Sequence, residues 1–258
     1  MLHTEVRGTG PDLVMVHGWG MHAGVWEDWA DSLTGRFRVH LIDLPGHGYS
    51  KFTAGEHLDD WSVALAEVAP AEAWWLGWSL GGLLTLNLAR LDPDRVRGLI
   101  QLASTPRFVA STDWPYGVEA AVFDQFAGQL ADDARRTLAR FLALQVRGAN
   151  HGNDTLRRLR SRLEQRPQPQ AEALKAGLRL LQDTDLRIEL ATLNVPTRWL
   201  LGARDTLVPS NLGEQVPGRY VVVDGAGHAP FLSHPETCTA AITDWLRPTD
   251  GVNRHATG

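Results

Sequence analysis

The feature that most constrains the fold of this chain is an alternation of short apolar runs with stretches of helical spacing. Runs with the composition and length of buried strands occupy residues 13–16, 37–42, 73–77 and 98–102. Stretches in which apolar residues recur at helical spacing lie between them, at residues 26–33, 58–68 and 80–91. This order predicts an α/β fold in which a mostly parallel sheet carries helices on both faces.

The strand pattern is interrupted in the middle of the chain. Between residues 109 and 183 no strand signal appears, and amphipathic segments occupy residues 118–130, 132–146, 155–165 and 170–182. Strand runs return at 197–201 and 220–223, and a helical pattern follows at 236–246. We therefore expect one α/β core, and the expected boundaries are 1–108 with 185–247 for the core, 109–184 for an all-helical lid insertion, and 248–258 for a polar tail.

Composition excludes several classes of function. No apolar run approaches the ~18 residues needed to cross a bilayer, the first seven residues lack the pattern of a secretory signal, and Cys238 is the only cysteine. We therefore expect a cytoplasmic monomer without a membrane anchor. A net charge of −5 disfavours nucleic acid as a partner. The zinc, calcium, phosphate-loop and dinucleotide motifs are absent, so we expect no metal and no cofactor.

A serine lies where a predicted strand passes into a predicted helix. Residues 77–81 read Gly-Trp-Ser-Leu-Gly and match G-x-S-x-G, a pattern whose small residues permit a strained turn that exposes the serine hydroxyl above the sheet. The strand at 73–77 leads into this pattern and the helix at 80–91 leads out of it. Ser79 is therefore a candidate nucleophile, and the alternative is a structural Gly-Ser turn.

A serine nucleophile needs a histidine base. His228 ends a Gly-Ala-Gly-His loop directly after the last predicted strand, and it follows Ser79 in the chain, as the Ser, acid, His order of hydrolases requires. His17 and His47 also follow predicted strands but precede the serine. We expect these two to form hydrogen bonds within their loops.

The acid that orients the base has two candidates. Asp205 follows the strand at 197–201 and precedes His228 by 23 residues. Asp224 ends the final strand only four residues before His228. Asp205 is preferred, because a loop from the neighbouring strand offers the carboxylate a better approach to the imidazole.

An oxyanion intermediate needs two N–H donors. The first expected donor is the backbone of Leu80, which follows the nucleophile at the start of a helix, where N–H groups lack helical partners. The second is the backbone of Trp19, in the His-Gly-Trp-Gly loop after the first core strand. For the side chain of Trp19 we favour pocket lining over core packing, and for Trp78 the two interpretations are balanced.

The sequence is similar to a known family. Residues 16–20, 43–50 and 77–82 resemble α/β-hydrolases, and residues 17–20, 75–82, 140–145 and 228–235 together resemble the pimeloyl-[acyl-carrier protein] methyl ester esterases of biotin synthesis. The resemblance implies a serine carboxylesterase that removes a methyl ester from an acyl chain held on acyl carrier protein. It implies the catalytic residues Ser79, Asp205 and His228, and a substrate site formed by Trp19, Ser79, Leu80, Phe141, Leu142, Ala143, Leu144, Gln145 and His228. Residues 146–166 follow the family only loosely.

Positive charge is concentrated in the expected lid. Residues 135–166 contain nine arginines and two acidic residues, so this segment carries +7 and the rest of the chain −12. Several arginines are three or four residues apart, where like charges on a helix repel unless an acidic partner is present. We expect an acidic acyl carrier protein to contact Arg136, Arg140, Arg157 and Arg158, with a solvated lid surface as the alternative.

Two other functions stay open from the sequence. One is a broad-specificity esterase or lipase-like hydrolase that acts on short esters without a carrier. The other is a receptor with the hydrolase fold, which would bind a ligand and turn over slowly. Dehalogenases and epoxide hydrolases of this fold resemble the chain less, because they have an aspartate where Ser79 stands.

Overall fold

The computed structural model describes residues 1–53 and 55–246, so the predicted polar tail at 248–258 lies outside the described residues. A seven-stranded sheet in the order β1-β3-β2-β4-β5-β6-β7 forms the centre of the molecule. Neighbouring strands are parallel except β1 and β3, which are antiparallel. The strands are β1 (Thr4–Arg7), β2 (Asp12–Val16), β3 (Arg38–Ile42), β4 (Ala73–Trp78), β5 (Val96–Leu102), β6 (Thr197–Gly202) and β7 (Arg219–Val223).

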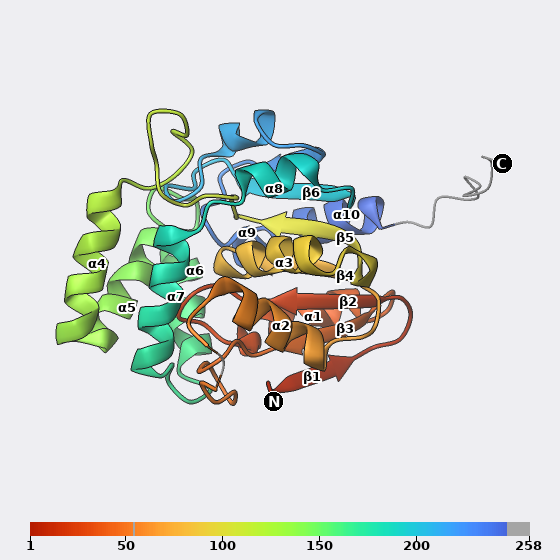
Figure 1. Cartoon of the computed structure of the whole chain (residues 1–258), viewed down its shortest axis with the longest axis horizontal. Helices are drawn as coiled ribbons and strands as arrows, with labels where there is room; N and C mark the ends of the chain where they lie inside the picture. The colour runs from red at the N-terminus through yellow and green to blue at the C-terminus, as the bar shows by residue number, and fades with distance from the viewer. Residues whose placement is uncertain (54, 247–258) are drawn as a thin grey trace.

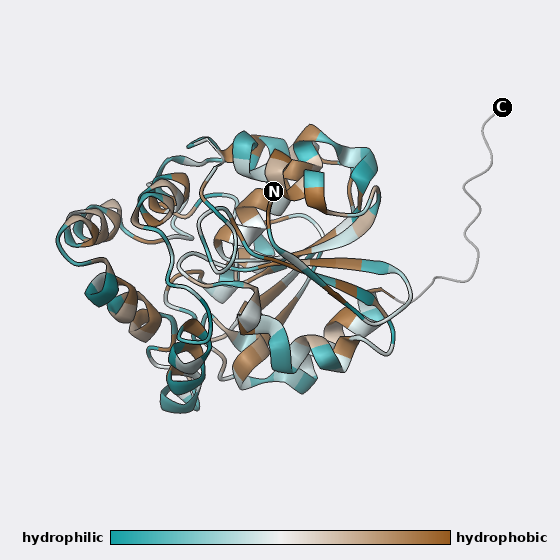
Figure 2. Ribbon diagram, turned by 90° about the horizontal axis from the view of Figure 1, so that it is seen from below, coloured by the Kyte–Doolittle hydropathy of each residue, from teal (hydrophilic) through white to brown (hydrophobic). Residues whose placement is uncertain are grey.

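Helices cover both faces of the sheet (Figures 1 and 2). On one face α2 (Leu58–Val68) contacts α3 (Leu80–Leu91), and on the other α1 (Glu27–Leu33) contacts α10 (Pro235–Trp245). The remaining helices of the core are α8 (Arg187–Thr192), α9 (Pro230–Ser233) and the 3-10 helices η1 (Ala23–Trp26), η2 (Pro93–Arg95) and η3 (Ser210–Glu214). In the described part of the chain, no helix is long and apolar enough to span a bilayer.

Four helices form a separate layer beyond the carboxyl ends of the strands (Figure 1). They are α4 (Ala120–Asp132), α5 (Ala134–Gln145), α6 (Gly152–Leu163) and α7 (Ala171–Asp183). Helix α4 contacts α5 and α7, and α5 contacts α6. We call residues 109–184 the lid. Within it the structure has isolated β-bridges but no strand.

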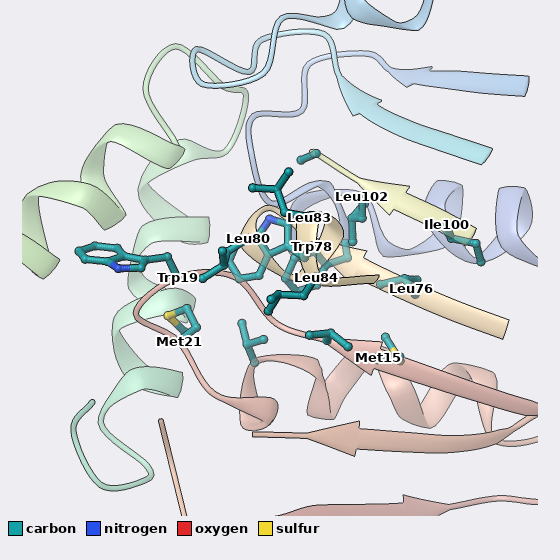
Figure 3. Packing of buried hydrophobic residues seen from close by; sticks show 14 of the residues in the cluster. Met15, Trp19, Met21, Leu76, Trp78, Leu80, Leu83, Leu84, Ile100 and Leu102 are labelled. Atoms are coloured by element: carbon teal, nitrogen blue, oxygen red, sulfur yellow. The ribbon is translucent and has the colours of Figure 1, made fainter. Parts of the chain in front are cut away.

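Helix α3 positions the start of the site. It contacts β2, β4 and β5 of the sheet and also α2 and α7, so nearly all of its residues are buried. Figure 3 shows Leu80, Leu83 and Leu84 of this helix packed beside Trp78 and Leu102. Because apolar contacts surround the helix, its first turn is held in place at the carboxyl edge of β4, beneath the lid.

The expected strands and helices are confirmed, and most bounds differ by one or two residues. Helices α2 and α3 have the predicted bounds. Strand β1 (Thr4–Arg7) was missed because its Thr-Glu-Val-Arg sequence has no apolar run, and its residues are partly or fully exposed. Its pairing with β3 fixes it at the edge of the sheet as a strand.

Candidate active site

Ser79 lies in a sharp turn between β4 and α3. Its backbone has φ 55° and ψ −118°, which is strained for a residue with a side chain. Its N–H donates to the carbonyl of Leu102 at 3.0 Å, and its carbonyl accepts from the Ser104 hydroxyl at 2.8 Å. A Cβ on Gly77 would collide with the backbone of Gly81, so the turn requires glycine there. These contacts maintain the turn that the G-x-S-x-G pattern predicts.

His228 and Asp205 form a buried pair. The Nδ1–H of His228 donates to Oδ2 of Asp205 at 2.8 Å, and both side chains are fully buried. The other carboxylate oxygen accepts from the N–H groups of Leu207 at 2.8 Å and Val208 at 3.1 Å. Because a carboxylate can only accept, this bond leaves Nε2 as the basic nitrogen of the neutral ring. Asp224 is exposed, so the structure brings Asp205 and not the rival acid to His228.

The basic nitrogen has no partner in the structure. Nε2 of His228 is buried and forms no hydrogen bond with any described residue. A buried nitrogen without a hydrogen-bond partner lowers the stability of a fold, so such a group needs an explanation other than packing. It is available for a proton from Ser79 once a substrate is bound, since catalytic hydrogen bonds are often long before binding.

The segments that carry the two expected oxyanion donors lie close to Ser79. Gly18 brings the loop after β2 close to the turn, because a Cβ placed on it would be 3.2 Å from Cβ of Ser79. The backbone N–H groups of Trp19 and Leu80 have no hydrogen-bond partner among the described residues. Both are therefore free to donate to a substrate oxygen.

The indoles on this side of the site pack in the interior. The Trp19 side chain is 1% exposed, donates to the carbonyl of Leu174 at 2.9 Å and meets the Phe141 ring edge-on at 4.9 Å. Figure 3 shows it extending from the sheet toward the lid. In this structure the indole fastens the loop to the lid, and it is not among the residues that line the cavity at Ser79. Trp78 is likewise fully buried.

Ser79 borders a small apolar cavity between the core and the lid. The other lining residues are Phe108, Val118, Val122, Phe123, Phe126, Phe141, Leu144, Leu178, Leu181 and Leu207. Most of them come from lid helices, and none is polar or charged. A cavity of this kind accepts an uncharged chain and offers no partner to an ion.

The lid residues assigned to substrate binding occupy different places. Phe141 and Leu144 line the cavity, whereas Gln145 is buried with its side-chain oxygen unpartnered among the described residues. Leu142 is fully buried outside the cavity lining, and Ala143 is exposed and borders a separate surface hollow. The structure therefore brings Phe141 and Leu144, but not Leu142 or Ala143, to the cavity at Ser79.

Comparison with known proteins assigns the chain to a family. A family model described as alpha/beta hydrolase fold matches residues 11–235. Pimeloyl-[acyl-carrier protein] methyl ester esterases from Stenotrophomonas maltophilia and Xanthomonas campestris are 45% and 46% identical, covering 97% and 93% of this chain and 99% and 97% of theirs. The chain belongs to this family of α/β-hydrolases. An esterase structure from Exiguobacterium antarcticum shows the same fold, with a TM-score of 0.84 and 22% identity. The match covers 95% of this chain and 94% of that chain.

Two lid arginines pair with carboxylates of the hydrolase core. Arg162 contacts Glu27 at 2.5 Å and also Asp28, and Arg158 contacts Asp28 at 3.4 Å. The hydrogen bond from Arg162 holds the pKa of Asp28 below its usual value. Both arginines therefore have acidic partners within the molecule, whereas the expectation for Arg158 was an acidic partner on a carrier protein. The pairing of Arg162 with Glu27 and Asp28 could not be inferred from the sequence, because more than one hundred residues separate the partners.

Arg166 is the most deeply buried of these arginines. Its guanidinium contacts Glu5 at 2.5 Å and the fully buried Asp43 at 3.2 Å, and it lies over the Tyr49 ring. Asp43 also accepts from backbone N–H groups of two loops at the carboxyl edge of the sheet. Arg166 thus fastens the lid to the loops that surround the site, and its charge is used within the molecule.

The remaining arginines in question are more accessible. Arg136 and Arg140 are exposed on α5, and Arg140 donates to Gln129 at 2.8 Å. Arg157 pairs with Asp154 at 3.0 Å, but both side chains are largely exposed and such a pair contributes little. Three of the four residues expected to meet a carrier therefore have guanidinium groups available at the lid surface.

Sequence reasoning missed most of the cavity wall. Phe108, Val118 and Leu207 come from loops, and Val122, Phe123, Phe126, Leu178 and Leu181 come from α4 and α7. The amphipathic pattern of those helices shows an apolar face but not what that face covers.

Proposed function

We propose that the chain hydrolyses the methyl ester of pimeloyl-[acyl-carrier protein] methyl ester to pimeloyl-[acyl-carrier protein] and methanol. Relatives that share about 45% of residues over nearly the full length are named for this activity. The chain is an α/β-hydrolase with a serine at the strand-to-helix turn and a histidine-carboxylate pair beside it. The cytoplasmic location and the monomeric state stay predictions.

The proposed mechanism proceeds through an acyl-enzyme. Ser79 Oγ attacks the ester carbonyl while Nε2 of His228 accepts its proton, and Asp205 holds the ring and stabilises the imidazolium. The N–H groups of Trp19 and Leu80 bind the oxyanion. Collapse of the intermediate releases methanol, which takes the proton from His228, and water then attacks the acyl-enzyme by the same steps in reverse.

The observation that carries the proposal is the lining of the cavity at Ser79. All ten lining residues other than Ser79 are apolar. A methyl ester enters such a cavity as an uncharged group, whereas the carboxylate product would lose its hydration without gaining a partner. The cavity therefore favours the end of the acyl chain that carries the methyl ester, and it disfavours the carboxylate that hydrolysis produces.

We propose that the accessible lid arginines meet the carrier protein. Arg136 and Arg140 on α5 and Arg157 on α6 present positive charge at the surface. Phosphopantetheine carries a phosphate, and an acidic carrier surface would complement the same charges. Arg158 belongs to this set less directly, because it also contacts Asp28 and the carbonyl of Leu232.

Mass spectrometry of the carrier tests the substrate. Incubation of methyl-pimeloyl carrier protein with the enzyme should lower the mass of the carrier by one methylene and release methanol. Equal kcat/KM on a free short-chain methyl ester would instead favour the broad-specificity esterase. Binding of either ester without turnover would favour a receptor.

The nucleophile is tested by replacing Ser79 with alanine. Ser79→Ala should reduce turnover by about 10⁶-fold, because no other group can form the acyl-enzyme. Circular dichroism should show an unchanged fold, since the removed hydroxyl makes no hydrogen bond in the described structure. Near-normal turnover by the folded variant would remove Ser79 from the mechanism.

A further inference from the structure

The peptide groups of His228 are held on two sides. Its backbone carbonyl accepts a hydrogen bond from the indole Nε1–H of Trp78 at 2.7 Å, and its backbone N–H donates to the carbonyl of Gln145 at 2.9 Å. Trp78 directly precedes Ser79 in the chain, whereas Gln145 ends α5 of the lid. The base is therefore fastened both to the element that carries the nucleophile and to the lid.

The loop that carries His228 needs such contacts. Gly225 has φ 71° and Gly227 follows two residues later, so the backbone before His228 is conformationally permissive. Two other hydrogen bonds of this loop run to Arg204, on the β6 side, and to Asn150 of the lid. The imidazole itself is held by the carboxylate of Asp205, again from the β6 side. Among the described hydrogen bonds, only that of Trp78 joins this loop to β4.

The Trp78 ring is itself fixed in one orientation. It is fully buried and packs edge-to-face with the rings of Trp26 and Phe231, whose centroids lie 6.0 Å and 5.1 Å from its own. On another side, a Cβ on Gly18 would lie 3.2 Å from the indole. Figure 3 shows Trp78 beside Leu80 and Leu83, at the start of α3. A donor fixed in this way determines where the His228 carbonyl lies.

Two other buried indoles in the core donate no hydrogen bond within the described residues. The N–H groups of Trp26 and Trp75 are buried and have no hydrogen-bond partner among the described residues. The core therefore tolerates an unpaired indole N–H next to Trp78. The bond to His228 is a specific feature of Trp78 and not a general requirement of packing tryptophan here.

We propose that Trp78 is a positioning residue that sets the distance between Ser79 Oγ and Nε2 of His228. Its backbone continues into the nucleophile and its indole holds the backbone of the base, so one rigid side chain connects the two reacting groups. The inference rests on the proposed catalytic roles of Ser79 and His228. Small displacements matter here, because a 1 Å misplacement of a catalytic group costs about 10²-fold in rate.

The test is Trp78→Phe, with Trp26→Phe as the matched control. Both substitutions shorten a buried indole in one aromatic cluster, but only the first removes a hydrogen bond to His228. With a free short-chain ester, Trp78→Phe should lower kcat by about 10- to 100-fold and leave KM within about twofold. Trp26→Phe should leave both constants within about twofold, although its shortened side chain should also lower the temperature of thermal unfolding.

A second background separates positioning from general damage. In a His228→Ala enzyme the slow residual turnover no longer depends on the base, so adding Trp78→Phe should cause no further loss. A further loss in that background, an equal loss of kcat in Trp26→Phe, or unchanged kcat in Trp78→Phe would each overturn the inference. If Trp78→Phe does not fold, benzothienylalanine at position 78, which replaces only the N–H by sulfur, gives the same comparison.

The outcome can be separated from failure of the proposed function. If Ser79→Ala abolishes turnover while Trp78→Phe leaves kcat unchanged, the catalytic serine stands and the positioning role is wrong. If Ser79→Ala retains turnover, the proposed function itself fails.

Discussion

At the scale of single residues, burial distinguishes two carboxylates that sequence position could not. Both Asp205 and Asp224 follow strands close to His228. Asp205 is buried and accepts three hydrogen bonds, from His228 Nδ1 and from the N–H groups of Leu207 and Val208. Asp224 is exposed to solvent. A buried carboxylate with these partners is held in one orientation, which is what a fixed imidazole tautomer requires.

The two carboxylates should respond differently to the same substitution. Asp205→Asn should lower kcat by up to about 10⁴-fold, because an amide can donate to Nδ1 and thereby favours the wrong tautomer. Asp224→Asn should change kcat by less than about twofold. Steady-state kinetics on a free ester measures both effects, and the reverse ranking would assign the acid to Asp224.

At the scale of elements, the lid is joined to the core by ion pairs. Arg158 and Arg162 of α6 contact carboxylates of α1, and Arg166 contacts Asp43 and Glu5. These contacts place α6 against the core and leave the exposed arginines of α5 directed to solvent. The lid arginines therefore divide into a group that holds the lid and a group that is free to meet a partner.

Charge reversal should separate these two groups. The combined change of Arg136→Glu, Arg140→Glu and Arg157→Glu should raise KM for carrier-bound substrate about tenfold or more, since repulsion slows encounter. Hydrolysis of a free ester should stay within about twofold, because these side chains do not line the cavity. Salt should mimic the change, as the screening length falls from ~10 Å at 0.1 M to ~3 Å at 1 M.

Arg162→Gln is the control for this experiment. It removes a half-buried contact with Glu27 and Asp28, so it should lower Tm by roughly 2–6 °C and affect both substrates alike. Equal losses on both substrates in the triple variant would indicate lid damage. Unchanged kinetics on both substrates would indicate that the exposed arginines form a solvated surface and do not contact the carrier.

At the scale of the whole molecule, two buried histidines make stability depend on pH. His17 accepts from the N–H of Leu44 and donates to the carbonyl of Gly18, and His47 donates to the carbonyl of Pro45, as expected of loop histidines. Burial lowers the pKa of His47 to about 4 and that of His17 well below its usual value of 6.5. Both rings are therefore neutral in the folded state at pH values where the unfolded chain is protonated.

The sign of the effect follows from this difference. Below pH 6.5 the unfolded chain binds protons that the folded state does not, so the free energy of unfolding should fall as pH decreases toward about 4. Each histidine contributes about 1.4 kcal/mol per pH unit in this window. Urea unfolding measured between pH 7.5 and 5.5 should show this decline. In His47→Gln the free energy of unfolding should depend less steeply on pH, by the contribution of one histidine. An unchanged slope in the variant would contradict the buried neutral ring.

Much of this molecule was determined by local sequence. Apart from β1, α8, α9 and the 3-10 helices, the strands and helices of the core and the lid follow from apolar spacing, because the residues of an element show by themselves which face is buried. Ser79, Asp205 and His228 follow β4, β6 and β7, and their positions follow from glycine-rich turns and from the fact that parallel strands end at one edge. These features depend on residues that are neighbours in the chain.

The rest was decided by tertiary structure. Trp78 and His228 are 150 residues apart, and Arg162 and Glu27 are 135 apart, so no local pattern indicates that they meet. The same holds for the cavity wall, which combines loops of the core with faces of α4, α5 and α7. A hydrogen bond, an ion pair or a cavity lining depends on which surfaces face each other after packing, and periodicity shows only that each surface is apolar or charged.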